Sequence, residues 1–155
     1  MDALAALTAS FYTFAGGIFL VLAALERPIR GLMWGAEVHH DDVHAIQDTL
    51  KRFVHFLPKV MMLTLVTTLL LTLGQLWVRA FDVWSLVAIG LYLPIMSTIV
   101  VMLGSAIQGT KTIDLTTAHI SEVLALTRKV VVMHHLGLLL AVVQAPVFLL
   151  ALALG

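Results

Sequence analysis

The sequence predicts an all-α integral membrane protein in which four transmembrane helices form an antiparallel bundle. The first observation behind this prediction is composition: 61% of the 155 residues are hydrophobic and only 12% are charged, about half the charged share of an ordinary soluble domain. The second is a set of four long runs without Asp, Glu, Lys or Arg. The third is the distribution of the basic residues between those runs.

Each of the four runs is long enough to cross a membrane, which takes roughly 20 apolar residues in a helix. The runs cover about residues 3–25, 60–78, 83–107 and 130–154, and we expect them to form one transmembrane domain over residues 1–155. The helices of a soluble bundle would each show a polar stripe facing water, and these runs show none. Ala15, Gly16 and Gly17 offer a face on which another helix can approach closely.

The basic residues set the expected orientation. Eight of the nine lie in the long connections, residues 26–59 and 108–129, and only Arg79 lies in the short turn 79–82. Cytoplasmic loops of membrane proteins carry an excess of Lys and Arg. We therefore predict a cytoplasmic (inner) membrane protein with both long connections in the cytoplasm, and with both termini and the short turn outside.

Each long connection is expected to contain an amphipathic helix that extends the second or the fourth span on the cytoplasmic side. In the first connection, apolar residues recur at helical spacing over residues 43–57. Asp41 or Asp42 is a suitable N-cap for this helix. Pro58 should kink it where it enters the membrane.

All seven histidines lie on the predicted cytoplasmic side, and an ionisable residue inside a span usually has a functional role. Adjacent residues of a helix point about 100° apart, so at most one of His134 and His135 should face the bundle interior. Imidazole and carboxylate bind iron, copper and zinc. We predict a metal or haem centre near the cytoplasmic surface, held by His55 with His134 or His135. The further candidate ligands are His44, Asp48, His119 and Glu122.

The predicted cofactor is haem b or a transition metal, either iron or copper. A haem between the helices of a bundle would take axial nitrogens from His55 and from one of the two adjacent histidines. The thioethers of Met133, Met61 and Met62 would instead suit copper(I). Basic side chains beside the site would bind haem propionates or lipid phosphate; these are Lys51, Arg52, Lys59, Arg128 and Lys129.

Several classes of protein are excluded by what the sequence lacks. The chain has no cysteine, so disulfides, iron–sulfur clusters and zinc ribbons are ruled out. Its formal net charge is zero, which argues against a nucleic-acid partner. It contains no Gly-rich phosphate loop, no Ser-His-Asp pattern and no HExxH motif.

Two stretches, FAGGIFLVLAALERPIRG and AIQDTLKRFVHFLPKVMMLTL, resemble small bacterial four-span membrane proteins. One such group is the HemJ-type protoporphyrinogen oxidases, which are haem proteins, and another is the anthrone-oxygenase-like family. The resemblance covers roughly the first half of the chain. It implies that a haem or redox role on a four-span scaffold is plausible.

We therefore expect an integral membrane protein that binds a metal or haem and has a redox function. Its partners would be the lipid bilayer and a quinone or porphyrin, and it would act as a homo-oligomer or as a subunit of a membrane complex. Two other functions stay open. One is a non-enzymatic accessory subunit of a larger complex, and the other is a small transporter or pH sensor whose histidines titrate near neutral pH.

Overall fold

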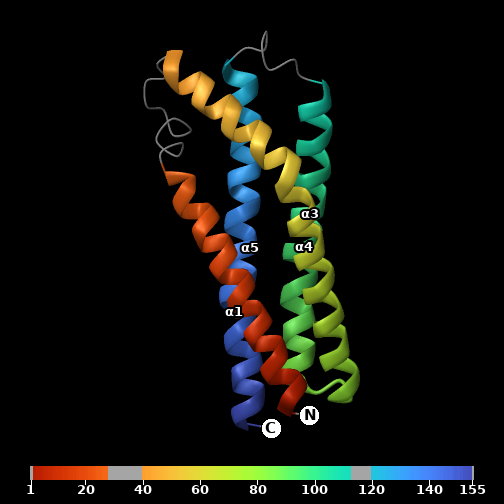
Figure 1. Cartoon of the computed structure of the whole chain (residues 1–155). Coiled ribbons are helices and arrows are strands. Elements are labelled where there is room, and N and C mark those ends of the chain that lie inside the picture. Colours follow the sequence, from red (N-terminus) through yellow and green to blue (C-terminus); the bar gives the residue numbers. More distant parts are fainter. Residues whose placement is uncertain (1, 28–39, 113–119, 155) are drawn as a thin grey trace.

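The computed structural model describes residues 2–27, 40–112 and 120–154, and it folds them into four α-helices. These are α1 (Asp2–Leu25), α3 (His40–Val78), α4 (Val83–Thr112) and α5 (Ile120–Leu154). Successive helices run in opposite directions, so both termini and the turn between α3 and α4 lie at one end (Figure 1). The prediction of an all-α protein with four helices able to span a membrane is confirmed.

The stretches long and apolar enough to cross a membrane are Ala3–Leu25, Lys59–Val78, Val83–Gly109 and Ile120–Ala151. The first three agree with the predicted spans within two residues. The fourth begins ten residues before the predicted start at residue 130, because the amphipathic turns ahead of it continue into the span as one helix. Most of the expected connection 108–129 is therefore helical, and residues 113–119 lie outside the described part.

Helix α3 joins the predicted amphipathic segment to the second span in one helix of 39 residues. Its upper part leans away from its lower part (Figure 1), in keeping with a kink at Pro58. The helix begins at His40, so the prediction of an N-cap at Asp41 or Asp42 was wrong. Both residues lie in its first turn.

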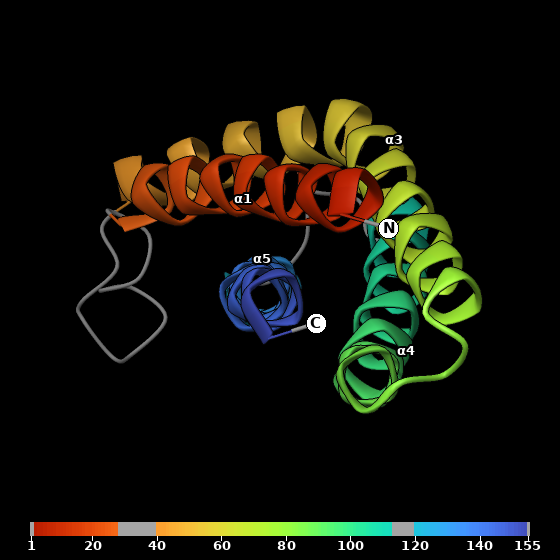
Figure 2. The same cartoon turned by 90° about the horizontal axis from the view of Figure 1, so that it is seen from below.

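Helix α5 is the centre of the arrangement. Seen from below, it lies between α1 on one side and α4 on the other, while α3 runs from beside α1 to beside α4 (Figure 2). The contacts of α5 with α1 and with α4 are the most extensive in the fold. Side chains that lie where α1 and α5 face each other are therefore buried between the two helices.

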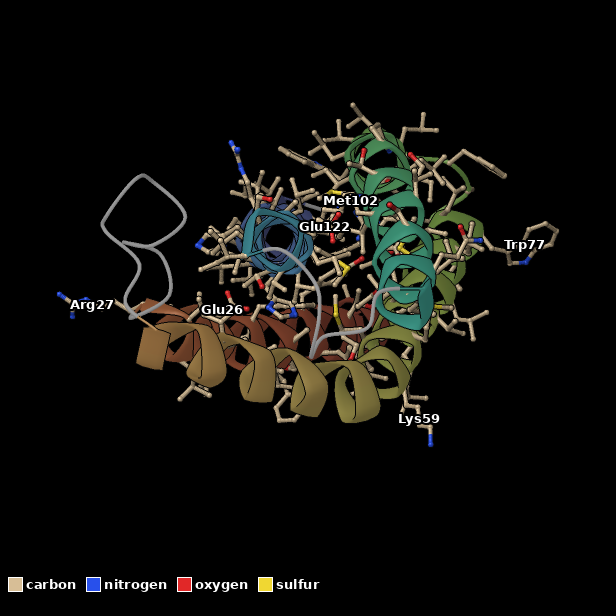
Figure 3. The ribbon with its side chains drawn as sticks, turned by 90° about the horizontal axis from the view of Figure 1, so that it is seen from above. Glu26, Arg27, Lys59, Trp77, Met102 and Glu122 are labelled. Atoms are coloured by element: carbon tan, nitrogen blue, oxygen red, sulfur yellow. The ribbon has the colours of Figure 1, made fainter. Side chains whose placement is uncertain are left out.

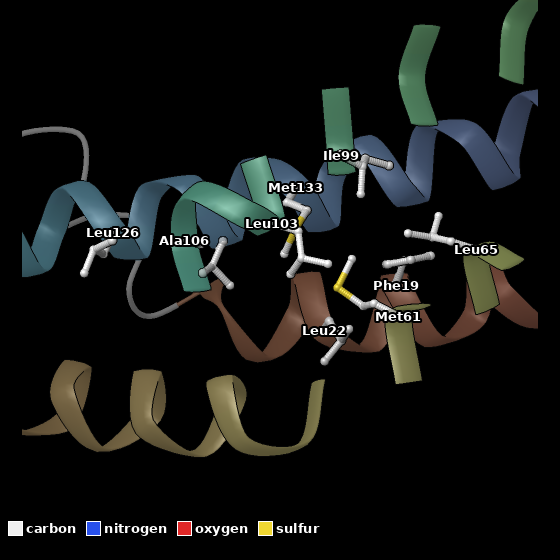
Figure 4. Close-up of a cluster of buried hydrophobic side chains, with 10 residues drawn as sticks. Phe19, Leu22, Met61, Leu65, Ile99, Leu103, Ala106, Leu126 and Met133 are labelled. Carbon is white, nitrogen blue, oxygen red and sulfur yellow. The ribbon is translucent and has the colours of Figure 1, made fainter. Parts of the chain in front are cut away.

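Two clusters of apolar side chains fill the interior. The cluster nearer the long connections is drawn in Figure 4; it contains Phe19, Leu22, Met61, Leu65, Ile99, Leu103, Ala106, Leu126, Val130 and Met133. The cluster nearer the termini includes Tyr12, Ala88, Tyr92 and Phe148, with the rings of Tyr12 and Phe148 stacked at a centroid distance of 5.7 Å. Exposed Leu and Val side chains lie along the described part of every helix, as expected for contact with lipid.

Small residues let α1 and α5 approach each other closely. A Cβ atom at Gly137 would lie 2.6 Å from two ring atoms of Phe19, and one at Gly16 would lie 3.2 Å from the Cβ of Ala141. Ala15 is buried at the same contact. A Cβ at Gly17 would meet nothing within 4 Å, so only the first two residues of the predicted small face serve this packing.

The short turn between α3 and α4 is held by a local network. Asp82 accepts a hydrogen bond from the backbone N–H of Ser85 at 2.8 Å and one from Nε of Arg79 at 2.6 Å, so it caps α4. Ala80 and Phe81 have φ angles of 51° and 63°, in the left-handed region that costs non-glycine residues energy.

Candidate functional site

A hydrogen bond between Glu26 and His134 joins α1 to α5 inside the bundle. Nδ1–H of His134 donates to Oε1 of Glu26, and both residues have an exposed fraction of 0%. Figure 3 shows Glu26 facing α5, whereas Arg27 and Lys59 point away from the bundle. A carboxylate and an imidazole removed from water in this way are costly unless they are paired, and here each is the other's partner.

The position of Glu26 follows from the last turns of α1. Its backbone N–H donates to the carbonyl of Leu22 at 3.0 Å, which continues the helical turn past Leu25. The side chain therefore shares a face with the buried residues Phe19 and Leu22. A carboxylate at this end meets the negative pole of the helix dipole, so the bond from His134 offsets an unfavourable location.

The two adjacent histidines have different environments, as their angular separation predicts. His134 lies on the face of α5 that carries the buried residues Val130 and Gly137. His135 is half-buried, and its Nδ1–H donates to the carbonyl oxygen of Val131 at 2.7 Å on the same helix. His134 is thus the histidine that faces the bundle interior.

Apart from His134 and His135, only Glu122 among the predicted ligands has a side chain in the described part of the chain. Glu122 is exposed and lies twelve residues before His134 in α5, roughly 18 Å along the axis, so the two cannot share one ion. His44, Asp48 and His55 belong to α3, but their side chains lie outside the described part of the chain, as does all of His119. His44 and His55 are eleven positions apart in a single helix, roughly 16 Å, which is too far for both to bind one ion.

At the end of the bundle that carries the long connections, the described basic residues are exposed: Arg27, Lys59, Arg128 and Lys129. Nζ of Lys129 donates to Oγ of Ser105 at 2.8 Å, linking α5 to α4. The side chains of Lys51 and Arg52 are outside the described residues. Over the described ranges, no group of three His, Asp or Glu residues could hold a metal ion.

A second set of polar groups lies in the half of the bundle nearer the termini. Tyr12 and Thr72 share a hydrogen bond of 2.7 Å, and Thr68 and Tyr92 share one of 3.1 Å. Nε2 of Gln75 donates to Oγ1 of Thr8 at 3.2 Å, and Nε2 of Gln144 donates to the carbonyl of Ala88 at 2.7 Å. The outside of the bundle is therefore apolar and part of its inside is polar.

Sequence reasoning missed Glu26, which it assigned to the cytoplasmic connection because it directly follows an uncharged run. One signal could have found it: Glu26 lies at helical spacing from Phe19 and Leu22 and so continues the inner face of the first helix. It also missed the polar face of α3, because threonine and glutamine carry no charge and do not interrupt an apolar run.

Comparison of the chain with protein-family models, with curated proteins and with solved structures finds no match. The resemblance to HemJ-type oxidases and to anthrone-oxygenase-like proteins therefore stays a prediction.

Proposed function

We propose that the chain is an integral membrane protein with a redox function, which binds a haem or a transition metal through His134 and orients this histidine through Glu26. The observation that supports the proposal is the buried bond from Nδ1–H of His134 to Oε1 of Glu26. Histidines that bind metals usually donate their other ring N–H to a carboxylate or carbonyl, which fixes the tautomer and makes the ligating nitrogen more basic. In this arrangement Nε2 of His134 would be the atom that binds the metal.

Haem and a bare ion differ in the number of protein ligands that they need. A bare transition-metal ion needs several. Haem iron takes its equatorial nitrogens from the porphyrin and needs only one or two axial ligands. His134 would supply one, His55 is the candidate for the other, and Arg128 and Lys129 lie at the same end for the propionates.

Copper is the alternative metal. Met61 and Met133 belong to one buried cluster, and Met133 is adjacent to His134. Thioether and imidazole ligands together suit copper(I). The redox partner would be a quinone or a porphyrin that reaches the site from the bilayer.

The test is the visible spectrum and the metal content of the purified protein. We expect a Soret band, or stoichiometric copper or iron, that is lost in His134→Ala and weakened in Glu26→Gln. His135→Ala is the matched control, because it removes an adjacent imidazole that faces elsewhere, and it should keep the spectrum. A colourless, metal-free wild-type protein would end this proposal.

A second candidate, proton-linked transport or pH sensing, is favoured by the position of the same pair. Carboxylates and imidazoles within spans commonly serve as proton relays. In liposomes, a proton flux that falls in Glu26→Gln, in a protein without metal, would favour this function. Stoichiometric partners that co-purify in mild detergent would instead favour an accessory subunit of a larger complex.

The proposed orientation places the Glu26–His134 pair near the cytoplasmic face of the inner membrane, with both termini outside. It rests on the excess of basic residues in the two long connections. A reporter that is active only outside the cytoplasm, fused to the C-terminus, tests this orientation and should be active. Activity of a reporter that works only in the cytoplasm, fused at the same position, would reverse the orientation.

A further inference from the structure

Helix α3 carries a polar stripe along its inner face. Thr64, Thr68, Thr72 and Gln75 follow one another at intervals of three or four residues, one per helical turn. The last three are buried, with exposed fractions of 3%, 1% and 0%. The stripe runs from near the turn between α3 and α4 towards the middle of the span.

Other helices contribute polar groups to this stripe. Tyr12 and Thr8 of α1 pair with Thr72 and Gln75, and Tyr92 of α4 bonds both to Thr68 and to the carbonyl oxygen of Leu65, the latter at 2.7 Å. The polar side chains thus form a layer of paired groups between α1, α3 and α4.

Two buried amide oxygens in this half of the bundle are left over, one in this layer on α3 and one on α5. Oε1 of Gln75 and Oε1 of Gln144 have no hydrogen-bond partner within the part of the chain that the structure describes, although both residues are fully buried. A polar atom without a partner is especially costly at membrane depth. Each oxygen therefore needs a donor small enough to reach it, and water is such a donor.

A small cavity continues the stripe towards His134. Most of its lining is apolar, but Tyr12, Thr64 and Thr68 bring hydroxyl groups to it, and Gly137 borders it. The space open to the centre of a water-sized sphere is about 10 Å³. This is the room that one water molecule requires, and the hydroxyl groups around it supply the polar partners that such a water needs. Gly137 lies one turn from His134 in α5, so the cavity ends just below the buried pair.

We propose that the stripe and the cavity form a water path, which leads from the end of the bundle that holds the termini to within one helical turn of His134. Its ligand is water, together with the protons that water carries along hydroxyl groups. The path accounts for the two unpartnered amide oxygens, which interhelical hydrogen bonding alone does not explain. It does not depend on a bound metal, so a metal-free protein would refute the proposed function and leave the path standing.

The test uses the absence of cysteine from the chain, since any single cysteine is then the only thiol present. Thr68→Cys, Thr72→Cys and Gln75→Cys are placed in lipid nanodiscs and exposed to Ag⁺, a small thiol reagent. The thiols that remain are then counted after unfolding. Leu70→Cys and Leu73→Cys are the matched controls, because these side chains lie on the same helix and face outward, with exposed fractions of 63% and 43%.

We expect the stripe cysteines to react about tenfold faster than the controls, because a thiol must be hydrated to ionise and bind the metal. Equal rates would show that the stripe only joins helices, and the proposal would fall. A second measurement avoids the variants altogether: NMR transfer of magnetisation from water to threonine methyl groups in the wild-type protein. Thr68 and Thr72 should receive it sooner than Thr98, which is exposed on the lipid-facing side of α4, and the opposite order would also overturn the path.

Discussion

Removal of the Glu26 carboxylate is the sharpest test of the buried pair. The imidazole of His134 has an exposed fraction of 0% in the folded protein, and Glu26→Ala removes the carboxylate to which its Nδ1–H donates. In His134→Ala, the carboxylate is left buried at the negative end of the α1 dipole. Either change should destabilise the folded bundle strongly.

Two magnitudes frame the expected loss. Removing one partner of a buried hydrogen bond costs about 1–3 kcal/mol, and more where a charged group takes part, because the remaining group is left unsatisfied. An ordinary interhelical hydrogen bond in a membrane averages about 0.6 kcal/mol and reaches about 1.7 at most. Because both members of the pair are fully buried, we expect Glu26→Ala to lower the free energy of unfolding by about 3 kcal/mol. Tyr12→Phe, which removes only a neutral hydrogen bond to Thr72, should lose about 0.6 kcal/mol.

The assay is unfolding by SDS in mixed micelles, followed by circular dichroism, for both single variants and for the double variant. If the residues act as a pair, the double variant loses much less than the sum of the singles. Glu122→Ala is the control, since it removes an exposed carboxylate and should change stability by less than about 0.5 kcal/mol. A loss in Glu26→Ala no larger than in Tyr12→Phe would refute the reasoning.

Three further predictions use the same unfolding assay. Gly137→Ala should destabilise the folded protein by about 1–3 kcal/mol, because the added methyl group overpacks against Phe19. Gly17→Ala adds a methyl group that meets open space, so it should be neutral or stabilise the protein by up to about 1 kcal/mol. Equal effects of the two changes would contradict the close approach of α1 and α5. Ala80→Gly should stabilise by about 0.5–1 kcal/mol, because an exposed alanine is held at a φ of 51°, and destabilisation would argue against that turn. Burial raises the pKa of Asp82, but the hydrogen bonds from Ser85 and Arg79 outweigh burial and hold the pKa below its ordinary value of 3.8. A group whose pKa is lowered by folding stabilises the protein fully at a pH above its ordinary pKa, and this stabilisation is lost as the pH falls through the pKa of the folded state. The loss of stability in Asp82→Asn should therefore be complete at neutral pH and become smaller below pH 3.8. A loss that does not depend on pH would exclude the carboxylate as its cause.

The sequence was sufficient for the four helices because the membrane imposes a simple rule on them. A spanning helix must be about 20 residues long and uncharged, and that rule can be tested on the residues alone. The less accurate boundaries, at the start of α5 and at the end of α4, fall where amphipathic turns continue a span. Composition changes there before the helix ends.

The site was harder to predict because it depends on which helices meet. His134 was identified as an ionisable residue within a span, and the choice between His134 and His135 required the position of α1. Glu26 directly follows a run of apolar residues, and its spacing from Phe19 and Leu22 indicates the inner face only if the helical turn continues to residue 26. Only the crossing of α1 and α5 brings Glu26 to His134, and they are 108 residues apart in the chain.

The energetics of the polar stripe argue that stability is not the reason for it. In the described interior, five hydrogen bonds join different helices through these neutral side chains, and at the membrane average they contribute about 3 kcal/mol together. Each of the two unpartnered amide oxygens costs about 1–3 kcal/mol if it stays dry. A dry polar interior would therefore be no more stable than an apolar one of the same shape. Water in the layer changes this balance, because it satisfies the amide oxygens and leaves the hydrogen bonds intact.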